Sequence, residues 1–121
     1  MSSDQEPCFI TCLPCEDEKS AVELIDKIRK LIGPRITDAD DPKEDAWKIL
    51  SWGGVEFTLM WSKNCQDFED FTGLVVYKTE YLLPMDFCEF QKTVNAFDSL
   101  VTWLGDHGFE ITKPQVIGIY V

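Results

Sequence analysis

Basic residues are scarce in this sequence. It has 11 lysines and arginines against 22 aspartates and glutamates, which gives a formal net charge of −11. Contacts to nucleic acid phosphates require clustered Lys and Arg, and anionic membrane surfaces attract basic segments. The shortage of bases therefore argues against both as direct partners. The excess of acids favours a basic protein as the partner, because electrostatic fields of opposite sign accelerate association. A role of the acids in solubility alone stays open.

Long apolar runs are also missing. No stretch reaches the roughly 18 apolar residues of a membrane-spanning helix. The first residues, MSSDQEP, are polar and acidic and lack the basic and apolar regions of a secretory signal. We therefore expect a cytoplasmic protein. Its five cysteines are an odd number and cannot all pair within one chain, so reduced thiols are expected.

Signatures of catalysis are equally sparse. There is no glycine-rich phosphate loop, since Gly53-Gly54 has the spacing of a hairpin turn. His107 is the single histidine, and no nucleophile motif accompanies it. The cysteines lack the second ligand pair of a typical zinc site. We therefore expect a binding protein with no cofactor, no bound metal and no catalytic residues.

The chain does have the composition of one folded domain. It is 121 residues long, and 45% of them are hydrophobic. Residues 1–7 are expected to be a loose N-terminal tail, and the domain covers 1–121.

Two segments have the apolar periodicity of amphipathic helices. Residues 17–32 repeat apolar side chains every three or four positions and end at Gly33-Pro34. Residues 84–105 do the same over about five turns, with Asp86 and Glu89 at capping-box spacing. Both helices are expected to pack against a sheet.

The strands are predicted around a tryptophan-rich antiparallel meander. Its three runs are residues 47–52, 55–62 and 74–82, and the middle run alternates apolar and polar side chains. Residues 8–13 and 115–121 make two further strands. The order β-α-β-β-β-α-β predicts an α+β fold with an antiparallel or mixed sheet of about five strands.

Acidic residues concentrate in two predicted connections. The first, residues 35–45, precedes the meander, and the second, residues 64–72, interrupts it. Aromatic anchors flanked by charge are common in contact surfaces, and the second connection contains such an arrangement around Phe68. Solvated loops would show the same composition. The predicted partner-binding residues are Asp38, Asp40, Asp41, Glu44, Asp45, Asp67, Phe68, Glu69 and Asp70.

In size, acidity and order of elements the chain resembles the immunity proteins of bacterial toxin–immunity pairs, such as those of contact-dependent growth inhibition. That resemblance implies a monomer that binds a cognate toxin domain, often a nuclease, in a one-to-one complex. A nuclease site is basic because it must attract phosphates, so an acidic inhibitor can bind at the same positively charged site in place of the substrate.

Two alternatives remain open at this stage. Residues 17–105 resemble the helix–three-strand–helix core of type III secretion chaperones, which are small, acidic and dimeric. Cys12-Leu13-Pro14-Cys15 has the spacing of a thioredoxin-like redox pair placed between a strand and a helix start. The middle of the chain departs from that family, because a meander replaces its helix-connected strands.

Overall fold

The computed structural model describes residues 5–33, 36–38, 47–65, 71–79 and 87–120. Over these residues the order is β-α-β-β-β-β-α-β, which confirms the predicted α+β class. The elements are β1 (Gln5–Pro14), α1 (Glu18–Ile32), β2 (Ile36–Asp38), β3 (Trp47–Trp52), β4 (Val55–Cys65), β5 (Phe71–Thr79), α2 (Phe87–Asp106) and β6 (Gln115–Tyr120). The described strands form one antiparallel sheet in the order β2-β3-β4-β5-β1-β6.

Several predicted boundaries were wrong. Strand β4 runs on to Cys65 and β5 begins at Phe71, so both ends of the predicted connection 64–72 belong to strands. The connection 35–45 contains a short strand, because Ile36 pairs with Leu50 of β3 and buries its side chain in the core. Three residues are too few to show a strand periodicity in the sequence. Residues 5–7, which were predicted as part of a loose tail, belong to β1, since Gln5 pairs with Tyr120 of β6. Pairing with a strand about 110 residues away leaves no local signal.

Helix α1 begins and ends where its sequence predicts. Asp17 is the N-cap, and its carboxylate accepts a hydrogen bond of 2.8 Å from the Ser20 amide. This bond holds the pKa of the Asp17 carboxyl below its usual value. Gly33 ends the helix with a φ of 74° and donates its amide to the Arg29 carbonyl at 2.8 Å.

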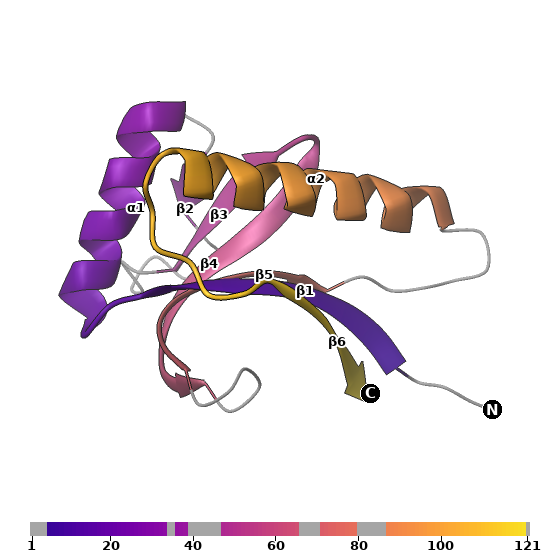
Figure 1. Ribbon diagram of the computed structural model, residues 1–121, viewed down its shortest axis with the longest axis horizontal. Helices are drawn as coiled ribbons and strands as arrows, with labels where there is room; N and C mark the ends of the chain where they lie inside the picture. The colour runs from indigo at the N-terminus through magenta and orange to yellow at the C-terminus, as the bar shows by residue number, and fades with distance from the viewer. Residues whose placement is uncertain (1–4, 34–35, 39–46, 66–70, 80–86, 121) are drawn as a thin grey trace.

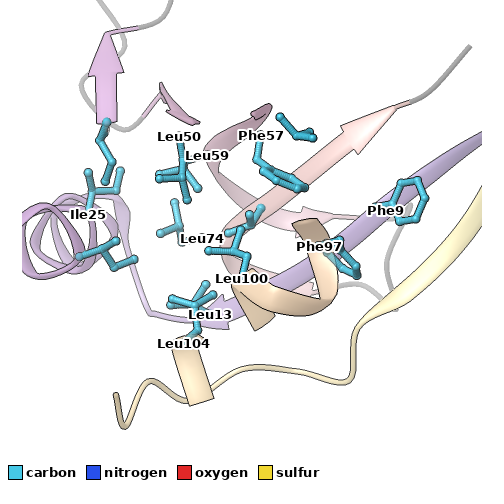
Figure 2. Packing of buried hydrophobic residues seen from close by; sticks show 14 of the residues in the cluster. Phe9, Leu13, Ile25, Leu50, Phe57, Leu59, Leu74, Phe97, Leu100 and Leu104 are labelled. Carbon is cyan, nitrogen blue, oxygen red and sulfur yellow. The ribbon is translucent and has the colours of Figure 1, made fainter. Parts of the chain in front are cut away.

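Both helices cover one face of the sheet (Figure 1). Alternate residues of the central strands point to that face, and the helices meet them with their apolar stripes. Figure 2 shows the resulting core around Phe57, Leu74, Phe97 and Leu100. The rings of Phe57 and Phe97 lie 6.2 Å apart. The fold is therefore two layers, with helices above a twisted sheet.

The helix-free face of the sheet also buries side chains. Cys8, Ile10, Cys12 and Val75 form a second apolar cluster there, each at most 4% exposed, and Phe71 packs against it. Strands β1 and β5 consequently have runs buried on both sides, unlike the alternation of a sheet with one solvated face. In Figure 1 the far ends of β4 and β5 curve beneath this face.

Helix α2 ends in a Schellman motif. The Phe109 amide donates to the Leu104 carbonyl and the Gly108 amide to the Gly105 carbonyl, both at 3.1 Å. Gly108 has the left-handed φ of 82° that this turn requires. The observed helix covers most of the predicted 84–105, whereas its first three predicted residues, Asp86 among them, lie outside the described residues.

Two glycines at this helix end should respond oppositely to alanine. A Cβ at Gly105 or at Gly108 would meet no atom within 4 Å, so neither substitution causes a steric clash and only the backbone conformation distinguishes them. Gly105 lies within the helix, and we expect Gly105→Ala to raise the free energy of unfolding by about 0.5 kcal/mol.

Gly108→Ala should lower the free energy of unfolding by about 1 kcal/mol, because alanine is strained at positive φ. Urea unfolding of the two variants checks both signs. Stabilisation by Gly108→Ala would contradict the assigned turn.

Candidate protein-binding surface

The structure locates one of the nine predicted partner-binding residues. Asp38 is the last residue of β2. The other eight lie outside the described residues; they are Asp40, Asp41, Glu44 and Asp45 in 39–46, and Asp67, Phe68, Glu69 and Asp70 in 66–70. The strand ends on either side of these two segments are described.

Those strand ends lie at the same end of the sheet. A row of paired residues crosses five strands, from Asp38 through Lys48, Leu59 and Val76 to Thr11. The chain leaves β2 and enters β3 on one side of this row. On that same side β4 runs on to Cys65 and β5 begins at Phe71. The register therefore places the anchors of both acidic segments on the same side of this row, with Asp38 and Trp47 at the row and Cys65 and Phe71 further along the β4–β5 hairpin.

The beginning of α1 reaches the same end of the sheet. Pro14, the last residue of β1, pairs with Gly73 near the start of β5, and the chain then turns into α1 (Figure 1). Glu16, Asp17 and Glu18 follow at once and are exposed. The sequence does not indicate that these three acids lie beside β5, because that position depends on a strand pairing that leaves no local pattern.

A bend in the β4–β5 hairpin turns its far end toward the helix-free side (Figure 1). The register shifts between Ser62 and Cys65, as at a β-bulge, and Asn64 has a left-handed φ of 55°. The Asn64 amide donates to Thr72 Oγ1 at 3.1 Å across the hairpin. The bulge and this hydrogen bond therefore stabilise the bend of the hairpin just before and just after the segment 66–70.

The negative charge is unevenly distributed along the chain. Ten of the 22 acids, but two of the 11 bases, fall in the segments outside the described residues. Seven of these ten acids belong to 39–46 and 66–70. The described residues carry nearly balanced charge, and among them Lys19 follows the acidic start of α1 and Lys63 precedes the segment 66–70. The net charge of −11 therefore derives mainly from a few connections.

The Cys12–Cys15 pair has a different setting from a thioredoxin-like pair. Cys12 lies within β1 and is 0% exposed in the helix-free cluster, whereas Cys15 packs against the core on the helix side. Burial is the main cause that raises the pKa of the Cys15 thiol, and the charge of Asp17 raises it further. A reactive thiol requires a lowered pKa. The geometry therefore does not favour thiolate chemistry at this pair.

Within the described ranges no three His, Cys, Asp or Glu side chains are grouped as metal ligands. None of the helices there has the length and apolar character needed to span a bilayer.

Comparisons with known proteins give no further assignment. No family model, no curated protein and no solved structure matches this chain.

Proposed function

We propose that this protein binds and neutralises a basic protein partner, and that the partner is a toxin domain with a phosphate-binding nuclease site. One observation carries the proposal. The strand register brings the anchors of both acidic segments, and the acidic start of α1, to one end of the sheet. Acids that extend from these anchors would concentrate negative charge at that end, and concentrated charge attracts a positive surface more strongly than the same charge spread evenly.

The proposed complex depends on two separate contributions. The acids of 39–46 and 66–70 steer the partner and form ion pairs, which increases the association rate. Phe68 is the aromatic residue in the second segment, and it would supply apolar contact area at the centre of the interface. By occupying the field that attracts a phosphate substrate, the protein would block the partner's active site.

Charge reversal tests the proposal. The partner to use is the protein encoded by the neighbouring reading frame, purified as its basic toxin-like domain. Replacing Asp67, Glu69 and Asp70 with lysine should lower the association rate at low salt by on the order of tenfold or more. The difference should shrink at high salt, because surface charges are then screened. Stopped-flow fluorescence measures the rate, and nuclease inhibition should fall in parallel.

A second triple variant controls for net charge. Glu56, Glu89 and Asp98 are exposed and lie away from the acidic end of the sheet, on β4 beside the hairpin turn and on α2. Replacing these three with lysine changes the net charge equally and should alter the association rate far less. Equal effects of the two triple variants would show that only total charge matters. An unchanged rate in the first variant would remove these acids from the interface.

A further inference from the structure

A cavity of about 490 Å³ lies between the second half of α1 and the turn that follows α2. Figure 1 shows these two segments side by side. Helix α1 contributes Leu24, Lys27, Lys30 and Leu31, and the turn contributes His107 and Phe109. The volume is within the range of small-molecule sites, roughly 300–1,000 Å³. This cavity is formed by described residues alone and does not involve the proposed partner-binding surface.

The apolar part of the cavity follows from the positions of its residues. Leu24, Lys27 and Leu31 are spaced by three and four and share one side of α1, next to the stripe that is buried in the core. Leu31 is 55% exposed, which is unusual for a large apolar side chain. Phe109 is directed back toward the core by the Schellman turn at Gly108. One wall of the cavity is therefore apolar and open to solvent.

The polar part of the cavity is mainly cationic. Lys27 and Lys30 are exposed, and the described structure records no ion pair for either of them. The ion pair recorded on α1 joins Arg29 to Asp26 at 3.7 Å. Glu110 also lines the cavity and is its one acidic residue. Such a grouping of cations is unexpected in a chain with a net charge of −11.

His107 adds a directed polar group. Its Nδ1 lies 2.8 Å from the Trp103 carbonyl oxygen, and since a carbonyl only accepts, Nδ1 must carry the proton. The imidazole stacks on the Trp103 ring at 4.2 Å, which fixes its orientation. Nε2 is therefore the ring nitrogen that can meet a ligand. It accepts a hydrogen bond when the ring is neutral and donates one when the ring is charged.

We propose that this cavity binds an amphiphilic organic anion, with one carboxylate or phosphate group on an apolar body. The apolar body would lie against Leu24, Leu31 and Phe109. The anionic group would meet the Lys27 and Lys30 ammonium groups in charge-assisted hydrogen bonds, and His107 would donate to it from Nε2 only in the charged form of the ring. A polyanion such as nucleic acid does not fit, because the remaining surface of the protein would repel it.

Decanoate is a suitable probe, and decanol is its uncharged match. Decanoate below its micelle concentration should bind saturably, and it should shift the backbone amide NMR signals of Leu24–Leu31 and His107–Glu110. Decanol should bind about tenfold or more weakly, because it lacks the charge. The double variant Lys27→Gln/Lys30→Gln should weaken decanoate binding by about tenfold while leaving decanol binding unchanged. Circular dichroism checks that the variant is folded.

The control variant is Lys19→Gln/Lys113→Gln, which removes two exposed lysines that do not line the cavity. It should bind decanoate like the unmodified protein. Vesicles of phosphatidylglycerol distinguish a free amphiphile from a lipid headgroup, and the net charge predicts no binding to them. Absent decanoate binding, equal affinity for decanol, or equal losses in the two double variants would each overturn the proposal. Vesicle binding that depends on Lys27 and Lys30 would assign the cavity to a membrane lipid instead of a free ligand.

Discussion

Replacing Phe57 with alanine is expected to lower the free energy of unfolding by about 4 kcal/mol. Phe57 is 0% exposed and lies on β4 at the centre of the helix-side core (Figure 2). It pairs with Leu50 across the sheet and packs against the Phe97 ring of α2. Alanine would remove the contact between Phe57 and the Phe97 ring of α2, and it would leave a cavity that the surrounding side chains can fill only in part. Urea unfolding measures the loss.

Two further variants keep the Phe57 test interpretable. Total stability of domains of this kind is about 5–15 kcal/mol, so Phe57→Ala could be largely unfolded. Phe57→Leu should cost less, about 1.5 kcal/mol, and remain folded. Thr58 is the next residue on β4 and points to the opposite face, so Thr58→Ala should cost about 1 kcal/mol or less. A loss for Thr58→Ala as large as that for Phe57→Ala would contradict the assignment of the two faces.

Gly73→Ala is the second substitution with a large expected effect, a loss of about 3 kcal/mol. A Cβ at this position would collide with the Leu13 carbonyl oxygen of the neighbouring strand and approach the Phe71 ring to 2.6 Å. The carbonyl belongs to the backbone of β1 and cannot move away like a flexible side chain. The β1–β5 pairing would have to shift to admit the methyl group.

The position of Gly73 connects this prediction to the binding surface. Gly73 pairs with Pro14 at the base of the hairpin that carries the segment 66–70. Ser62, its partner on β4, is the matched control, and Ser62→Ala should change stability by less than about 1 kcal/mol. Thermal unfolding compares the two. A fully stable Gly73→Ala protein would show that β1 and β5 are not packed this closely.

The sequence predicted the elements whose signals are local. The helix 17–32 has an apolar stripe and a terminal glycine, and both were found where the pattern indicated. The alternation from Val55 to Trp61 correctly gave the core side of β4. Strand β2 was missed because its one core residue, Ile36, stands alone between polar residues.

The sequence does not indicate which strands pair when they are far apart along the chain. Strand β1 lies between β5 and β6, and its run from Cys8 to Leu13 is buried on one face by the helix-side core and on the other by the helix-free cluster. An apolar run of that length predicts a strand but does not identify its neighbours. The same limit applies to the proposed binding surface. Composition identified its acidic segments, but only the strand register shows that their anchors share one end of the sheet with the start of α1.

The most direct test of the proposed function is an NMR footprint of the complex with the basic toxin-like domain. Amide signals of the unbound protein would be compared with those of the one-to-one complex at low salt. We predict that the perturbed amides concentrate in three regions, which are residues 15–19, 38–48 and 63–72. A footprint on the outer side of α2 or along β6, with these three regions unperturbed, would contradict an acidic interface at this end of the sheet.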